Sequence, residues 1–172
     1  MKSIKEETNL NNKKILLRLD LNVPLLGDKI TDTTRIDKIL PTLNFLISQN
    51  AKIIIISHVG RPKGKVINEL SLKPICKDLE IKLSQNIKLI SKDIKEIASM
   101  DLFNNNEKIV MLENIRFYPE EEKNNSQFAK QLASLADIYV NDAFSCSHRA
   151  HASIDEITNF LPCYSGLQLD LE

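Results

Sequence analysis

Glycine is scarce in this sequence, with only four residues in 172. A loop that cradles the phosphates of a nucleotide needs closely spaced glycines. The best candidate is the segment with Gly60, Gly64 and Lys65, but its spacing is one residue short of the phosphate-loop motif. Val66 also stands where that motif needs Ser or Thr. The sequence therefore argues against a nucleotide-binding loop in this chain.

Net charge and long apolar runs are also lacking. Lys and Arg total 23, as do Asp and Glu, which argues against general binding to nucleic acid or to a membrane surface. The longest apolar runs, such as Ile53–Ile56, are far too short to cross a bilayer. The polar segment Met1–Asn11 has no apolar core of a secretion signal. We therefore expect a cytoplasmic protein that binds neither nucleic acid nor a membrane.

The three cysteines, Cys76, Cys146 and Cys163, are odd in number and lack the spacing of a metal site. In a cytoplasmic protein we expect them to be reduced thiols, with a disulfide as the alternative. The sequence assigns no role to any of them.

Strands and helices are predicted to alternate along the chain. Near-continuous runs of Ile, Leu and Val are typical of parallel strands that are buried on both faces. Five such runs are Lys14–Leu19, Ile53–Ser57, Ile87–Ile90, Ile109–Leu112 and Ile138–Val140. Helical spacing occurs at Ile36–Ile47, Leu72–Leu83, Lys92–Met100 and Ser126–Ala136. This order predicts an α/β fold, a doubly wound and mainly parallel sheet with helices on both faces, which is Rossmann-like.

The start of the first helix and the structure of the C-terminal tail are less clearly defined by the sequence pattern. Pro41 lies inside the first helical stripe, so that helix is expected to kink there or to begin later, with Asp32 or Thr33 as its cap. The tail Ile154–Glu172 does not complete another strand–helix unit and carries no stop signal. We interpret it as a chain that is cut in a connecting segment.

Arginine is the minority cation, with five residues among the 23 basic ones. Unlike lysine, it offers a planar, bidentate donor for carboxylates and phosphates. The arginines lie where the predicted strands end, together with other polar residues. This set comprises Arg18, Asp20, Asn22, Arg35, His58, Arg61, Arg116, Asn141, Asp142, His148, Arg149 and His151. Ligands of open α/β sheets bind beyond the carboxyl ends of the strands, so the set predicts a site for a small ligand with several negative charges.

Each of these residues has an ordinary structural explanation when it is taken alone. An Asp at a strand end is more often a helix cap or an ion-pair partner, and His58 could be a structural histidine. Arg35 could simply pair with Asp32 near the start of its helix. The placement of the whole set is what favours a binding site.

Four longer segments resemble the phosphoglycerate kinases. They are Leu17–Pro24 (LRLDLNVP), Ser57–Gly64 (SHVGRPKG), Leu112–Lys123 (LENIRFYPEEEK), and Asn141–Phe144 (NDAF) followed by His148–Ser153 (HRAHAS). They occur in the order of the family and cover the chain from Leu16 to about Ile157. Small departures are Leu21 for the usual Phe, Val59 for the usual Leu, and Ser145-Cys146 for a Gly and a small residue. Residues 165–172 match the family poorly.

The resemblance implies a glycolytic phosphotransferase that acts on a carboxyl group. Such an enzyme moves a phosphoryl group between 1,3-bisphosphoglycerate with ADP and 3-phosphoglycerate with ATP, using Mg²⁺. Residues 1–160 would be the N-terminal phosphoglycerate-binding domain, and residues 161–172 the start of an interdomain connection. The C-terminal domain that binds ATP or ADP and Mg²⁺ would be absent, so we expect no metal or nucleotide site here.

The resemblance also implies a role for each site residue. Asp20 and Asn22 would contact the hydroxyl and carboxylate end of the glycerate. A clamp on the phosphate that is not transferred would consist of His58, Arg61, Arg116 and Arg149. Arg35 would be catalytic and lie against the transferring phosphoryl group, and Arg18 would support the loop that carries Asp20.

Two other functions fit the same residues. The chain could be a stand-alone anion- or phosphoglycerate-binding module without catalysis, or an unrelated α/β protein with a similar anion site. The enzyme interpretation predicts a monomer that is inactive alone. Its partners would be 3-phosphoglycerate or 1,3-bisphosphoglycerate and its own C-terminal domain.

Overall fold

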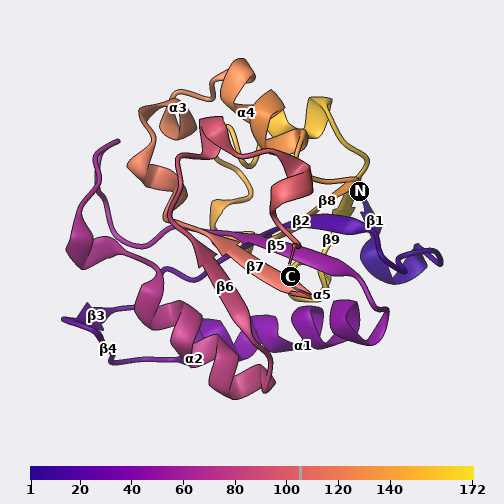
Figure 1. Cartoon of the computed structure of the whole chain (residues 1–172), viewed down its shortest axis with the longest axis horizontal. Helices are drawn as coiled ribbons and strands as arrows, with labels where there is room; N and C mark the ends of the chain where they lie inside the picture. The colour runs from indigo at the N-terminus through magenta and orange to yellow at the C-terminus, as the bar shows by residue number, and fades with distance from the viewer. Residues whose placement is uncertain (105) are drawn as a thin grey trace.

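A seven-stranded parallel sheet forms the centre of the computed structural model, which describes residues 1–104 and 106–172 (Figure 1). Its strand order is β1-β9-β8-β2-β5-β7-β6. The strands are β1 (Lys2–Ser3), β2 (Lys14–Leu19), β5 (Lys52–Ile56), β6 (Ile87–Ile90), β7 (Ile109–Leu112), β8 (Ile138–Asp142) and β9 (Cys163–Ser165). A separate antiparallel hairpin pairs β3 (Leu25–Leu26) with β4 (Lys29–Ile30). The five predicted strands are confirmed to within two residues.

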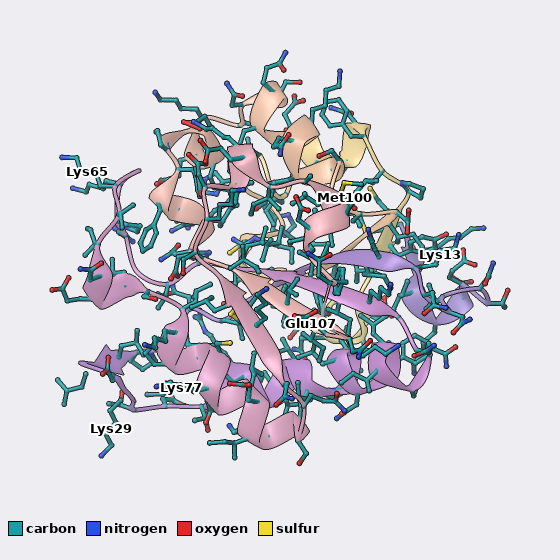
Figure 2. The ribbon with its side chains drawn as sticks, in the orientation of Figure 1. Lys13, Lys29, Lys65, Lys77, Met100 and Glu107 are labelled. Carbon is teal, nitrogen blue, oxygen red and sulfur yellow. The ribbon has the colours of Figure 1, made fainter. Side chains whose placement is uncertain are left out.

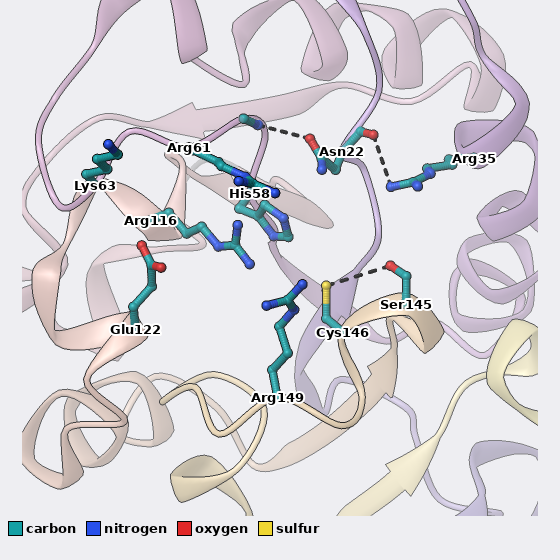
Figure 3. Close-up of a pocket in the computed structure, with 11 residues that line it drawn as sticks. Asn22, Arg35, His58, Arg61, Lys63, Arg116, Glu122, Ser145, Cys146 and Arg149 are labelled. Atoms are coloured by element: carbon teal, nitrogen blue, oxygen red, sulfur yellow. Dashed lines mark hydrogen bonds between the residues drawn. The ribbon is translucent and has the colours of Figure 1, made fainter.

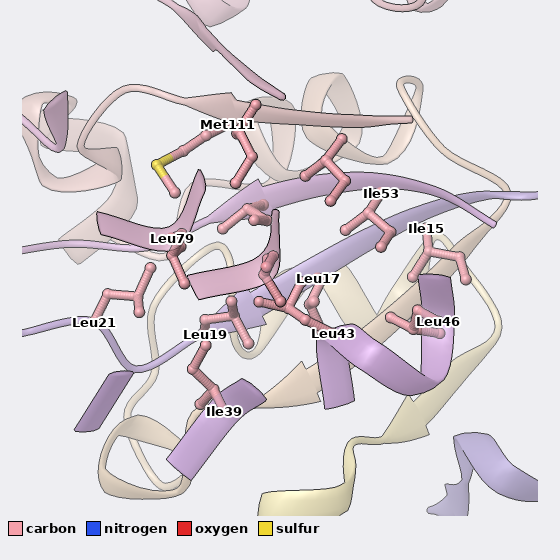
Figure 4. Close-up of a cluster of buried hydrophobic side chains, with 14 of the residues drawn as sticks. Ile15, Leu17, Leu19, Leu21, Ile39, Leu43, Leu46, Ile53, Leu79 and Met111 are labelled. Carbon is pink, nitrogen blue, oxygen red and sulfur yellow. The ribbon is translucent and has the colours of Figure 1, made fainter. Parts of the chain in front are cut away.

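Helices cover both faces of the sheet, as Figure 1 shows. They are α1 (Thr34–Ser48), α2 (Lys73–Leu83), α3 (Pro119–Glu122), α4 (Ser126–Ala133) and α5 (Leu167–Leu171). Alternate residues of β2 enter opposite cores, because successive side chains of a strand point to opposite faces. Leu17 packs with residues of α1 and α2 in one core (Figure 4), whereas Leu16 packs with residues of α4 in the other. The predicted doubly wound α/β class is confirmed.

Helix α1 begins at Thr34, well before Pro41, so a later start is wrong. Its buried residues, among them Ile36, Ile39 and Leu43, pack on the sheet along one stripe. The free energy gained by burying them exceeds the cost of the backbone hydrogen bond that Pro41 cannot donate. Thr33 occupies the N-cap position without a side-chain cap. The carboxylate of Asp32 accepts a hydrogen bond from the Thr34 amide at 2.9 Å instead.

The helix predicted for Lys92–Met100 is wrong. The segment forms two short 3-10 helices, Ile94–Glu96 and Ser99–Asp101. Apolar residues three apart suit a 3-10 turn as well as an α-helix. Gln131 holds this conformation, because its side-chain amide donates to the carbonyls of Ile94 and Ile97, each at 3.0 Å.

The expectation that the tail adds no strand–helix unit is also wrong. β9 pairs in parallel with β8 and with β1, and α5 follows it directly. Both elements are too short for a periodic pattern, and a side-chain network holds them in place. Asp142 accepts hydrogen bonds from the Leu169 amide at 2.9 Å and from the Thr42 hydroxyl at 2.5 Å, and that hydroxyl accepts one from the Leu167 amide at 3.0 Å. That residues 161–172 lead to a second domain stays a prediction.

We expect Gly166→Ala to lower the free energy of unfolding by about 1–3 kcal/mol. A Cβ atom at Gly166 would overlap the side chain of Asp142, which holds α5. Urea unfolding of the variant measures the effect. Gln168→Ala is the matched control, since among the described residues the Gln168 side chain makes one hydrogen bond, an exposed one to Glu172. Equal stability of the two variants would contradict the prediction.

Among the residues that the structure describes, every helix is too short or too polar to span a bilayer.

Candidate anion-binding site

The carboxyl ends of β2, β5, β7 and β8 border a pocket of about 580 Å³ (Figure 3). Its lining residues are Asn22, Arg35, His58, Gly60, Arg61, Lys63, Arg116, Glu122, Ser145, Cys146 and Arg149. Six of the predicted site residues are therefore brought together. Asp20 lines a neighbouring pocket of about 200 Å³ that shares Arg35 and Ser145 with the first. Arg18 lines neither pocket.

Two of the five arginines are buried, whereas Arg35, Arg61 and Arg149 are exposed. Lys29, Lys65 and Lys77 are exposed and lie at the periphery of the molecule (Figure 2). By contrast, Arg18 is completely buried and Arg116 is 8% exposed. Burying a guanidinium is costly unless its donors find acceptors, so each buried arginine needs an explanation.

Arg18 lies beneath the pocket and has acceptors for all of its nitrogens. Its Nε donates to the Ser153 hydroxyl at 3.0 Å, and Nη1 donates to the Leu19 carbonyl at 2.8 Å. Nη2 lies 2.8 Å from Nδ1 of His58. The Ser153 hydroxyl in turn donates to the buried carboxylate of Glu121 at 2.5 Å. Arg18 thus ties the end of β2 to His58 and to α3.

His58 is held as a neutral hydrogen-bond donor. A guanidinium can only donate, so Nδ1 of His58 accepts from Arg18 and the ring hydrogen lies on Nε2. The ring is 2% exposed. Burial is the main cause that lowers its pKa to about 2, and the positive charges of Arg18 and Arg116 add to it. A neutral imidazole in this pocket donates to an anion without adding a charge.

We expect the His58 ring to stay neutral between about pH 8 and 5, where an unperturbed histidine gains its charge. Its folded-state pKa lies below the ordinary value of 6.5. The contribution of His58 to the free energy of unfolding is therefore at its full value above pH 6.5. It is lost progressively as the pH falls towards 2, by up to about 1.4 kcal/mol per pH unit. Proton NMR titration of the histidine rings, assigned with His58→Gln, measures this. A His58 signal that titrates near pH 6.5 in the folded protein would contradict it.

Arg116 is buried but incompletely paired. Its Nε has no hydrogen-bond partner within residues 1–104 and 106–172. Burial is the main cause that lowers the pKa of its guanidinium, and the positive charges of Arg18 and Arg149 act in the same direction. Figure 3 shows the guanidinium groups of Arg116 and Arg149 directed towards the same space as His58. A ligand with acceptor oxygens would satisfy donors that the protein leaves open.

Arg35 pairs with Asp20 rather than with Asp32. Its Nη1 donates to Oδ1 of Asp20 and to the carbonyl of Asn22, each at 3.1 Å. The other oxygen of Asp20 accepts from the Ser145 hydroxyl at 2.6 Å. The Asn22 side chain accepts from the Gly60 amide at 2.9 Å. These contacts fix Asp20 and Asn22, while the Arg35 side chain remains 47% exposed.

Sequence reasoning missed five residues of the pocket, namely Gly60, Lys63, Glu122, Ser145 and Cys146. Lys63 and Gly64 have positive φ, and a Cβ at Gly64 would come within 2.9 Å of Pro119, so their loop packs closely against α3. Lys63 stands within the SHVGRPKG segment, which was a usable signal. By contrast, Asp142 at the end of β8 and His151, which follows that strand, do not line the pocket.

No group of three or more His, Cys, Asp or Glu side chains in the described part of the chain is arranged to hold a metal ion. The pocket instead combines five cationic side chains with one carboxylate, Glu122. Such a pocket suits a small ligand that carries several negative charges.

Comparisons with known proteins point to one family. A family model described as phosphoglycerate kinase matches residues 5–172. The phosphoglycerate kinase of Wolbachia pipientis subsp. Culex pipiens is 54% identical over 172 residues, and that of Moorella thermoacetica is 45% identical over 168. The alignments cover 97% of this chain in both cases, but 42% and 43% of the relatives. The chain thus spans less than half of the length of these relatives.

Two solved structures have the same fold. Phosphoglycerate kinase from Coxiella burnetii matches with a TM-score of 0.88 and 38% identity, over 98% of this chain and 42% of that one. The enzyme from Pyrococcus horikoshii matches with a TM-score of 0.80 and 27% identity, over 99% of this chain and 44% of that one.

Proposed function

Because the chain belongs to the phosphoglycerate kinase family and corresponds to its N-terminal domain, we propose that its arginine-lined pocket binds 3-phosphoglycerate and 1,3-bisphosphoglycerate. The observation that carries the proposal is the buried guanidinium of Arg116 with an unpaired donor, in a pocket that also holds three other arginines and a neutral His58. A phosphate and a carboxylate on one small molecule match these donors.

The roles proposed for the residues are those that the resemblance to the family implies. His58, Arg61, Arg116 and Arg149 hold the phosphate that is not transferred. Asp20 and Asn22 contact the hydroxyl and carboxylate end of the glycerate. Arg35 lies between the two adjoining pockets and acts on the transferring phosphoryl group. Arg18 is a positioning residue that holds His58 from below.

The chemistry asks these residues for position and charge rather than for proton transfer. The attacking group of 3-phosphoglycerate is a carboxylate, which is already ionised at neutral pH, so no general base is needed. Cations that are fixed beforehand lower the barrier by stabilising the charge of the transferring phosphoryl group. The contacts of Arg35 with Asp20 and Asn22 fix its guanidinium in this way.

ATP or ADP and Mg²⁺ do not fit the described residues of this chain. The sequence has four glycines and no complete phosphate loop, and within residues 1–104 and 106–172 no acidic cluster suits a metal. We propose that nucleotide and metal bind to a C-terminal domain of the longer protein. The complete enzyme would be a cytoplasmic, glycolytic monomer, and these 172 residues alone would not turn over.

Calorimetric titration tests the proposal. We expect 3-phosphoglycerate to bind the 172-residue chain saturably at low salt and more weakly as the salt concentration rises, since ions screen the exposed charges. Glycerate, which lacks the phosphate, should bind at least about tenfold more weakly, because the loss of one charged contact costs over 1.4 kcal/mol. Arg61→Gln should reduce the affinity, whereas Lys77→Gln, an exposed lysine outside the pocket, is the matched control.

The same preparation separates the alternatives. Turnover of ATP with 3-phosphoglycerate by the 172-residue chain would contradict the assignment of the nucleotide to another domain. Binding that persists in a longer protein without turnover would favour a pure binding module. An absence of saturable 3-phosphoglycerate binding at low salt would contradict the proposed site.

A further inference from the structure

A thiol lies in the wall of the anion pocket. Cys146 ends the 3-10 helix Phe144–Cys146 that follows β8, and its side chain lines the pocket together with Arg116 and Arg149. Figure 3 shows the sulfur beside the guanidinium of Arg149, with a hydrogen bond that joins it to the Ser145 hydroxyl 3.7 Å away. Only 4% of Cys146 is exposed, so a reagent must enter the pocket to reach the sulfur.

The pocket attracts anions before any reaction takes place. Four arginines and Lys63 line it against one carboxylate, Glu122, and His58 adds no charge because its pKa is lowered to about 2 by burial. Arg116 is 8% exposed, its buried Nε has no hydrogen-bond partner among the described residues, and its guanidinium is directed towards this space. Clefts lined by one sign of charge raise the local concentration of ligands of the opposite sign.

The other two thiols differ in their surroundings. All three cysteines are free. Cys76 is buried in the core beneath α2, and burial raises its pKa to about 12. Burial also raises the pKa of Cys163 in β9. Neither lines the anion pocket, so they serve as internal controls for any effect of its charge.

We propose that Cys146 is a modification site for small disulfides that carry carboxylate groups, and that its modification closes the anion pocket. This inference concerns regulation and rests on the proposed function of the same pocket. The carboxylates of the disulfide would contact the arginines that otherwise hold the phosphate.

The reaction is a thiol–disulfide exchange. Cys146 loses its proton to solvent, and the resulting thiolate attacks one sulfur of the disulfide. A new sulfur–sulfur bond forms to Cys146 as the original one breaks, and the second half of the reagent leaves as a thiolate with the electron pair. Cys146 is oxidised and the departing half is reduced. The half that stays attached occupies the pocket until an added thiol reverses the exchange.

Two reagents test the role of charge. Dithiobis(nitrobenzoate) carries two carboxylates, and dithiodipyridine is neutral. Rates at each cysteine of the unaltered chain are followed by mass spectrometry of its peptides, so the test does not depend on a cysteine variant that folds. We expect the ratio of the anionic to the neutral rate to be about tenfold or more higher at Cys146 than at Cys163, and to fall with rising salt.

Variants and ligands make the test sharper. Arg149 is exposed, so Arg149→Gln should fold normally and lower the ratio at Cys146 only. Inorganic sulfate should slow modification of Cys146 by filling the pocket. Once Cys146 is modified, calorimetry should show sulfate binding at least about tenfold weaker, as expected for a filled site, and dithiothreitol should restore it.

Each outcome decides the inference. No selective reaction of the anionic reagent at Cys146, or unchanged sulfate binding after its modification, would overturn it. Protection by sulfate without protection by 3-phosphoglycerate would support it while contradicting the proposed substrate. Binding of 3-phosphoglycerate together with an inert Cys146 would overturn the inference and leave the proposed function standing.

Discussion

Replacement of Arg35 with alanine in the full-length protein is expected to lower kcat by about a hundredfold or more, the loss typical of one donor that acts on the transition state. A contact that strengthens only as the phosphoryl group transfers contributes to kcat and little to substrate binding. The KM for 3-phosphoglycerate should therefore change much less. Steady-state kinetics with varied 3-phosphoglycerate measure both quantities.

Two variants bracket this result. Arg61→Ala should mainly raise KM, because Arg61 is proposed to hold the phosphate that is not transferred. Arg35→Lys should recover only part of the lost activity, since a point charge replaces a planar fork. Lys38→Ala is the matched control on the next turn of α1, because Lys38 borders only the neighbouring pocket.

A structural role for Arg35 makes a different prediction. Its ion pair with Asp20 involves a side chain that is 47% exposed, and such pairs contribute little to stability. The melting temperature of Arg35→Ala should therefore stay close to that of the unaltered protein. A variant with near-normal kcat, whatever its melting temperature, would end the proposal for Arg35.

Replacement of Arg18 with methionine is expected to lower the free energy of unfolding by about 3–5 kcal/mol, as for other buried charges that lose their partner. The substitution removes the donors that bind His58, Ser153 and the Leu19 carbonyl. The Ser153 hydroxyl would still donate to the buried carboxylate of Glu121, but it would no longer accept a hydrogen bond from the Arg18 cation. Urea unfolding measures the loss.

Two control variants separate the effect of losing a buried arginine from the effect of losing a positive charge. Arg149→Met removes an exposed arginine of the same pocket and should change stability by less than about 0.5 kcal/mol. The double variant Arg18→Met/Glu121→Gln should lose less free energy of unfolding than the sum of the losses in the two single variants. The reason is that Arg18→Met already removes the cation that is linked to Glu121 through Ser153. A loss of less than about 1 kcal/mol for Arg18→Met would contradict the support role.

Strands made of buried aliphatic runs could be predicted from the sequence, and the short elements at the C-terminal end could not. β2 was predicted to the residue, because a run of buried aliphatic side chains suits a central parallel strand and little else. β9 has three residues and α5 has five, too few for any period to show. They form because Asp142, Thr42 and the neighbouring strand bind their backbone groups.

The site divides in the same way. The sequence by itself determined which side chains could gather, because the carboxyl ends of parallel strands meet at one edge of a sheet. Only the tertiary structure decided that Arg18 lies beneath the pocket, that Arg35 pairs with Asp20, and that Cys146 enters the wall. Burial and partners across the fold set these outcomes, and they depend on residues far apart in the chain: Ser153 lies 135 positions after Arg18.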